Sequence, residues 1–267
     1  MDRTEVKIEP TIKIEEDSKI LSLGSCFADE VGGMLKSDGH DVMSNPAGIL
    51  FNPQSLALHL WSVATNQIEE KHFGDYQDTH FHFDFHSKTN GSDLQSVRSK
   101  ISDALSLSRE QLKEADYLIL TFGTAWVWRY LKTDSIIANC HKVPQNEFRK
   151  ELLDLTSLIQ VYRELVSDLL EFNPNLQIIL TVSPVRHTRN GLPEDKRSKS
   201  ILLLLCHALS DEFETVTYFP AYEVVLDELR DYSYFKGNLI HPTDETIGEV
   251  YKRFCRFAQM SDPSSLE

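Results

Sequence analysis

Short apolar runs alternate along this chain with segments of helical periodicity, and this alternation constrains the fold more than any other feature. Parallel strands need long crossover connections, so runs separated by helices predict a parallel sheet. We therefore expect an α/β fold in three layers, with helices on both faces of the sheet. The apolar runs lie at 19–23, 117–122, 177–182 and 216–219. Helices are expected at about 27–36, 53–64, 94–114, 147–172, 194–212 and 244–257.

The segments between these elements predict elaborations of one domain. Residues 1–18 are polar with weak alternation, which is typical of an extended arm. A strand or lid edge is expected within 72–91, and a hairpin is expected from 126–130 and 136–138. No Gly-, Ser- or Pro-rich linker divides the sequence. We therefore expect a single domain over 1–267, elaborated at about 65–115 and 124–146.

Charge and cysteine usage argue against several classes of protein, although a local patch could still bind nucleic acid or membrane. The net charge is −14, which argues against binding nucleic acid or an anionic membrane surface. No apolar run approaches the ~18 residues of a membrane span, and the N-terminus has no apolar signal segment. The four cysteines are far apart, unlike a zinc or disulfide framework. We expect a cytoplasmic protein with reduced thiols and no cofactor, and the oligomeric state stays open.

Ligands of open parallel sheets bind beyond the carboxyl ends of the strands, and Cys26 follows the first apolar run. There it would begin a helix, where backbone N–H groups and the helix dipole favour a thiolate. A free cysteine also often serves as a small buried side chain. Ser25 has two interpretations as well, a helix-capping hydroxyl or a rival nucleophile.

His241 is the candidate base. It follows Asn238 by three residues and precedes the last expected helix, so the amide could orient its ring. A structural or solvated histidine is the alternative.

Other polar residues extend the candidate site. Arg186 and His187 follow the run at 177–182 and form a small cationic cluster with Arg189, suited to an anionic substrate group or to surface ion pairs. His141 is expected to form a pocket wall or to end the hairpin. A metal site in the His-rich segment is a third interpretation, although we expect no metal: His80, His82 and His86 would share one face of a strand.

Several sequence blocks resemble those of the GSCFA family. The string Gly24-Ser25-Cys26-Phe27-Ala28 carries the five letters that name the family. Further blocks that resemble it begin at Asn45, Gly123, Asn139, Thr181, Tyr218 and Asp227, and they span residues 24 to 232 together with the first.

This resemblance implies a fold like that of the SGNH hydrolases. By position, Cys26 takes the place of the nucleophilic serine, and His241 takes that of the triad histidine. Asn238 stands where those enzymes carry the triad aspartate, so it can orient the ring without supplying charge. Cys-His-Asn arrangements do occur in papain-like proteases.

The resemblance also implies an oxyanion site. Gly48 takes the place of the second-block glycine, and Thr124 would partly substitute for the oxyanion asparagine, because Ala125 stands in its position. Loss of one such donor typically costs ~2.7–4 kcal/mol of transition-state stabilisation.

We therefore expect an acyl-ester hydrolase or acyltransferase that uses a Cys26–His241 pair on a small-molecule acyl ester. By analogy with SGNH relatives, the substrate would be an acylated carbohydrate or another small ester. The alternative is a binding protein on the same scaffold with little or no catalysis, which the substitutions at Asn238 and Ala125 favour.

Overall fold

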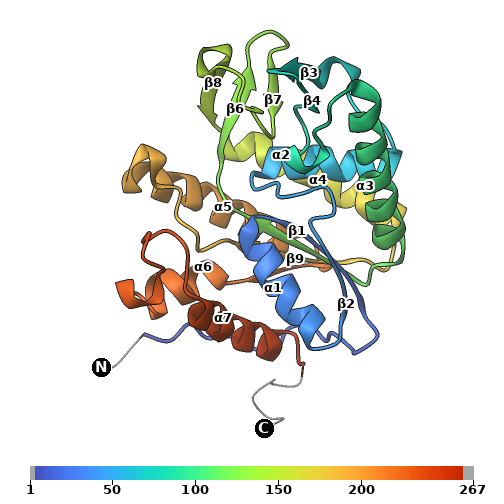
Figure 1. Ribbon diagram of the computed structural model, residues 1–267. Coiled ribbons are helices and arrows are strands. Elements are labelled where there is room, and N and C mark those ends of the chain that lie inside the picture. Colours follow the sequence, from blue (N-terminus) through green and yellow to red (C-terminus); the bar gives the residue numbers. More distant parts are fainter. Residues whose placement is uncertain (1–3, 261–267) are drawn as a thin grey trace.

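A computed structural model describes residues 4–260, apart from the side chain of Asn190. Both ends of the expected domain, 1–3 and 261–267, lie outside the described residues. The centre is a five-stranded parallel sheet in the order β10-β9-β5-β1-β2 (Figure 1). Numbered along the chain, these strands have the flavodoxin-like order 2-1-3-4-5. Their bounds are β1 (Lys19–Gly24), β2 (Asp41–Ser44), β5 (Tyr117–Phe122), β9 (Gln177–Val182) and β10 (Val216–Phe219).

Helices cover both faces of this sheet, which confirms the predicted three-layer α/β fold (Figure 1). One face carries α1 (Cys26–Ser37), α7 (Asp244–Phe257) and α6 (Ala221–Glu223), which continues into a π-helical turn, Val224–Glu228. The other face carries α2 (Pro53–Thr65), α3 (Leu94–Glu114), α4 (Leu155–Phe172) and α5 (Leu192–Glu212). Short 3₁₀ helices occupy Glu70–His72, Ser87–Thr89, Gln145–Glu147, Thr188–Asn190 and Tyr232–Tyr234.

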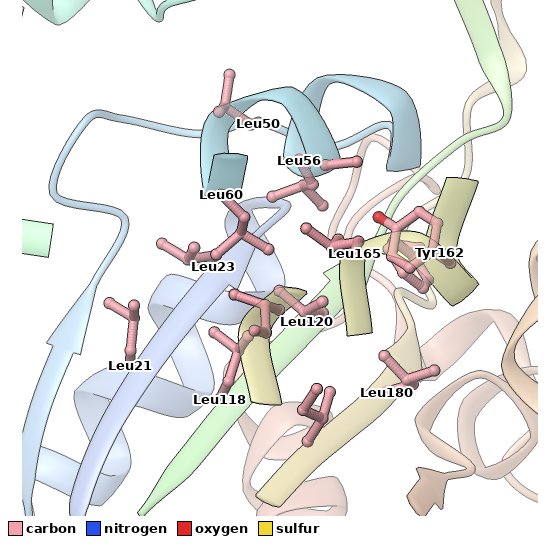
Figure 2. Close-up of a cluster of buried hydrophobic side chains, with 14 of the residues drawn as sticks. Leu21, Leu23, Leu50, Leu56, Leu60, Leu118, Leu120, Tyr162, Leu165 and Leu180 are labelled. Carbon is pink, nitrogen blue, oxygen red and sulfur yellow. The ribbon is translucent and has the colours of Figure 1, made fainter. Parts of the chain in front are cut away.

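Alternate residues of the central strands fill two separate cores. Successive side chains of a strand point to opposite faces, so near-continuous apolar runs can bury both. Ile20 and Ile119 face α1 and α7. Leu21 and Leu118 pack instead with side chains of α2 and α4, as Figure 2 shows. This two-sided burial explains why the runs lack polar alternation.

The described part of the N-terminal arm is extended, as predicted, and it contacts the C-terminal end of α7. Ile8 and Ile14 are buried in the core on the α1–α7 side. The backbone N–H of Ile14 donates to the Ala258 carbonyl over 3.0 Å, and that of Val6 donates to buried Glu228 over 2.9 Å. The first and last described parts of the chain therefore hold each other in place.

Two small antiparallel sheets lie beyond the carboxyl ends of β1 and β5 (Figure 1). One pairs β3 (Phe73–Tyr76) with β4 (Thr79–His82), and the other has the order β7-β6-β8. The predicted hairpin is confirmed as β6 (Trp126–Tyr130) and β7 (Ser135–Ile137).

The prediction of one helix over 147–172 is wrong at its start. Residues of β8 (Phe148–Leu152) pair with β6, and Asp154 then caps α4, which begins at Leu155. The ladder with β6 satisfies the β8 backbone, so the long-range pairing outweighs the helical periodicity. The edge strand β2 was not predicted either, because it is short and only Val42 of its four residues is buried.

Among the described helices, none combines the length and apolar character needed to cross a membrane.

Candidate active site

The turn between β1 and α1 is held by its neighbours on both sides. Gly24 has φ 144°, and a Cβ there would lie 2.2 Å from the Thr121 carbonyl oxygen, so the close approach to β5 requires glycine. The N–H of Gly24 donates to the buried Asn45 side chain over 2.9 Å, and that of Ser25 donates to the Thr121 carbonyl over 3.0 Å. These contacts place Cys26 at the start of α1, between the ends of β1 and β5.

The Cys26 thiol is half-buried, and its pKa is raised. Burial is the largest cause, the charge of Glu30 follows, and Asp29 adds to it. The N–H groups of Cys26 and Phe27 favour the thiolate but do not offset this. Burial and the two nearby carboxylates therefore outweigh the effect of the helix N-terminus, which was expected to favour the thiolate.

Ser25 serves as the N-cap of α1. Its hydroxyl oxygen accepts from the Phe27 N–H over 3.3 Å, and the residue is buried. This contact agrees with the interpretation of Ser25 as a helix-capping hydroxyl. Both Ser25 and Cys26 line the same cavity.

Asn238 holds the ring of His241, as predicted. Its Nδ2 lies 3.0 Å from His241 Nδ1, while its Oδ1 accepts from the N–H groups of Ile240 and His241 over 3.0 and 3.1 Å. Those two backbone donors fix which end of the amide faces the ring. The amide NH₂ donates to Nδ1, so a neutral His241 carries its proton on Nε2.

Cys26 and His241 come together in an open cavity of about 470 Å³, which we call the Cys26 cavity. The residues come from the ends of β1 and β9, from β6, from the segments that follow β4 and β7, and from the loops before α2 and α7. The lining comprises Ser25, Cys26, Ile49, Phe51, His86, Trp128, Ala138, Asn139, Cys140, Val185, His187 and His241. The carboxyl edge of the sheet thus holds the predicted thiol and imidazole together.

A second hollow of about 380 Å³ adjoins the first, and we call it the Lys150 cleft. Six residues line both hollows: Phe51, Trp128, Ala138, Val185, His187 and His241. The cleft adds the predicted residues Thr124 and Arg186, together with Trp126, Lys150 and Arg189.

The two expected oxyanion donors already have acceptors within the protein. Gly48 N–H donates to the Asn45 carbonyl over 2.8 Å, and its Cα packs against the His86 ring. Thr124 N–H donates to the Phe51 carbonyl over 3.2 Å, and its hydroxyl bonds Ser198 over 2.9 Å. In this conformation neither residue offers a free backbone N–H to a substrate oxygen.

The three predicted substrate-binding residues divide between surface and core. Arg186 borders the cleft, with its guanidinium 4.0 Å from the Phe235 ring centroid. His187 lines both hollows, and its pKa is lowered to about 3 by burial and then by the nearby Lys199. His141 is instead buried, stacked on Phe81 at 4.4 Å, with its pKa lowered to about 4 by burial. His141 therefore does not form the expected pocket wall. Its neighbours Asn139 and Cys140 line the cavity instead.

Lys199 is a buried cation that the sequence analysis missed. Its ammonium donates to the carbonyls of Gly123 and Ser183 over 2.6 Å each, at the ends of β5 and β9. Burial lowers its pKa to about 8. A signal was present in the sequence, since Asp195 and Lys199 are four residues apart on one helix face. Lys199 therefore links the ends of β5 and β9, which precede two segments that line the site.

The His-rich segment does not form the expected continuous strand. β4 ends at His82, whose Nε2 contacts the Glu69 carbonyl at 3.0 Å, and His86 caps the 3₁₀ helix that follows. Within residues 4–260, no group of three or more His, Cys, Asp or Glu side chains is arranged to hold a metal ion.

Comparison with known proteins adds one match. The model of the GSCFA family matches residues 19–254, which include every candidate residue described above. No curated protein matches the chain.

Proposed function

We propose, from the premise that this chain belongs to the GSCFA family, that it is an acyl-transfer enzyme with Cys26 as its nucleophile and His241 as its proton carrier. The proposed substrate is a small acyl ester, such as an acylated carbohydrate, and the acyl group passes to water or to another hydroxyl. The observation that carries the proposal is the shared cavity of Cys26 and His241. A thiol at a helix N-terminus that shares a cavity with an oriented imidazole is an arrangement that supports covalent catalysis.

The proton must move before the thiol can attack. The proposed reaction transfers the thiol proton to His241 Nε2, which requires the ring's own proton to reside on Nδ1. That tautomer gives up the hydrogen bond from Asn238, a cost of roughly 0.5–1.5 kcal/mol. We therefore expect slow turnover in the wild type.

The remaining steps are those of a two-stage acyl transfer. The Cys26 sulfur forms a bond to the acyl carbon, and the ester C–O bond breaks as His241 returns the proton to the leaving alcohol. Water or an acceptor hydroxyl then attacks the acyl-Cys26 thioester, giving its proton to His241. The thiol regains that proton when it leaves.

We further propose Asn139 as an oxyanion donor beside the Cys26 amide. Asn139 lines the Cys26 cavity, and its Oδ1 accepts from the His141 N–H over 2.9 Å. That contact leaves the NH₂ end of the amide for the cavity. A side-chain donor here would take the part that Ala125 cannot play.

The test is to trap the acyl enzyme with p-nitrophenyl acetate and locate the acetyl group by mass spectrometry. Acetylation at Cys26, lost in Cys26→Ala and reduced in His241→Ala, supports the proposal. Cys140 is the matched control, because it lines the same cavity with its pKa raised to about 11 by burial. Labelling that persists in Cys26→Ala and disappears in Ser25→Ala would move the nucleophile to Ser25.

A second candidate function is ligand binding without turnover. The engaged donors of Gly48 and Thr124 favour it, as does the amide at Asn238. Saturable ester binding with neither acyl-Cys26 nor product release would support this alternative.

A further inference from the structure

Lys150 is held above the aromatic wall of the cleft. It lies on β8 opposite Trp128 of β6, and its ammonium is 5.4 Å from the ring centroids of both Trp126 and Trp128. Such cation–aromatic contacts position a charge without neutralising it. The side chain is half-buried, and burial followed by the charge of Arg189 lowers its pKa.

The cations of the cleft are not neutralised by carboxylates. Among the described residues the side chains of Lys150 and Arg189 make no hydrogen bond or ion pair, and the Arg186 guanidinium donates to the Leu239 carbonyl. No described Asp or Glu lines the cleft, although the chain carries a net charge of −14. Unpaired cations at a concave surface of an acidic protein attract anions.

The carboxylates that lie close to Lys150 and Arg189 in the sequence are already paired with other arginines. Glu151, next to Lys150, binds Arg129 and Arg149 at 3.0 and 2.7 Å. Glu194 lies 3.6 Å from Arg197 on α5. The cationic character of the cleft is thus available to a ligand.

We propose that the Lys150 cleft binds an anionic group of the acyl substrate, a carboxylate or a phosphate, while the acyl carbon lies at Cys26. The inference rests on the proposed function and narrows its substrate to anionic esters. The two hollows share six lining residues, His187 and His241 among them, and in this proposal one molecule extends from one hollow into the other. Lys150 and Arg189 bind the anion, and Arg186 completes the rim.

The first test measures charge selectivity at Cys26 without any turnover. Iodoacetate and iodoacetamide alkylate the same thiol and differ in charge, so their rate ratio reports the local potential. We expect Lys150→Gln and Arg189→Gln each to lower the iodoacetate-to-iodoacetamide ratio, by about threefold to tenfold at low salt. Lys113→Gln is the matched control, because Lys113 is exposed near the start of β5, at the opposite edge of the sheet. A ratio unchanged in both cleft variants would overturn the proposal.

A second measurement does not depend on the thiol. In a Trp61→Phe background the two remaining tryptophans, Trp126 and Trp128, both lie beneath Lys150. We expect iodide to quench their fluorescence more strongly than caesium, and Lys150→Gln to remove the difference. Equal quenching by the two ions before and after the substitution would overturn the proposal even if Cys26 proves unreactive.

The closing experiment separates this inference from the proposed function. The substrates are three phenyl acetates, which carry a carboxylate, a phosphate or a neutral carboxamide at the para position. We expect higher kcat/KM for an anionic ester, lost in Lys150→Gln, and the two anionic arms decide between carboxylate and phosphate. Equal kcat/KM for all three would overturn the anion site but leave acyl transfer intact. Anion-selective alkylation and quenching without turnover would instead overturn acyl transfer and leave the anion site.

Discussion

Asn238 donates a hydrogen bond to His241, with 3.0 Å between Nδ2 and Nδ1. A triad aspartate would accept at this position and would stabilise the imidazolium. Here the amide donates to Nδ1, so a neutral ring carries its proton on Nε2. The direction of this hydrogen bond leads to the first prediction.

Asn238→Asp should accelerate the reaction of Cys26. The substitution preserves the shape of the side chain and the acceptor for the two backbone N–H groups, and it turns a donor toward Nδ1 into an acceptor. We expect alkylation of Cys26 near neutral pH to rise by about tenfold, limited by the exposure of residue 238 to solvent. Nitrogen NMR of His241 should show the proton move from Nε2 to Nδ1. Asn238→Ala, which removes all three side-chain hydrogen bonds, is the control. A rate in Asn238→Asp no higher than in wild type would refute the pairing.

Glu30→Gln should lower the pKa of Cys26. After burial, the charge of Glu30 is the largest cause that raises this pKa. Removing the charge keeps the helix intact and favours the thiolate, so the alkylation profile should move to lower pH. Glu171→Gln, an exposed change on α4, should leave the profile in place. An identical profile in Glu30→Gln would show that burial alone sets the pKa.

His59 should make the protein sensitive to acid. Its ring is buried on α2 beside Phe85, neither ring nitrogen has a hydrogen-bond partner among the described residues, and burial lowers its pKa from 6.5 to about 4. The unfolded chain binds a proton near pH 6.5 while the folded one does not, so the free energy of unfolding falls as the pH drops from about 6.5 to 4.

His59→Leu should remove this contribution, roughly 3 kcal/mol between the two ends of that range. Urea unfolding of both proteins across the range measures it. A comparison at about pH 8, above both pKa values, isolates the packing effect of the leucine. Equal pH slopes in the two proteins would contradict the assignment to His59. His141 and His187, whose pKa values are lowered to about 4 and about 3, should contribute with the same sign.

Gly24→Ala should destabilise the fold and displace Cys26. The new Cβ would meet the Thr121 backbone 2.2 Å away, at a φ of 144° that side chains rarely adopt. We expect a loss on the order of 3 kcal/mol in the free energy of unfolding, from strain and overpacking together. Gly33→Ala, an exposed position of α1 where nothing lies within 4 Å of the new Cβ, should instead stabilise by about 0.5–1 kcal/mol. Thermal unfolding of the two variants measures both effects.

The local sequence pattern alone predicted most strands of the central sheet. The runs that form β1, β5, β9 and β10 are short, apolar and bounded by turn residues, so their periodicity and position identified them. The same reasoning placed Cys26 and His241 at the carboxyl edge, because strand ends of a parallel sheet converge there. The pairing of Asn238 with His241 followed from their separation of three residues in one turn.

Long-range pairing decided what the sequence could not. Residues 148–152 have helical periodicity but join β6 as a strand, and only that register brings Lys150 over Trp128. The donors at Gly48 and Thr124 are engaged by carbonyls and a hydroxyl from elsewhere in the fold. The direction of the Asn238 amide follows from which backbone groups it meets. Periodicity specifies elements because it is local, whereas hydrogen-bond partners and burial depend on residues far apart in the chain, which only the tertiary structure brings together.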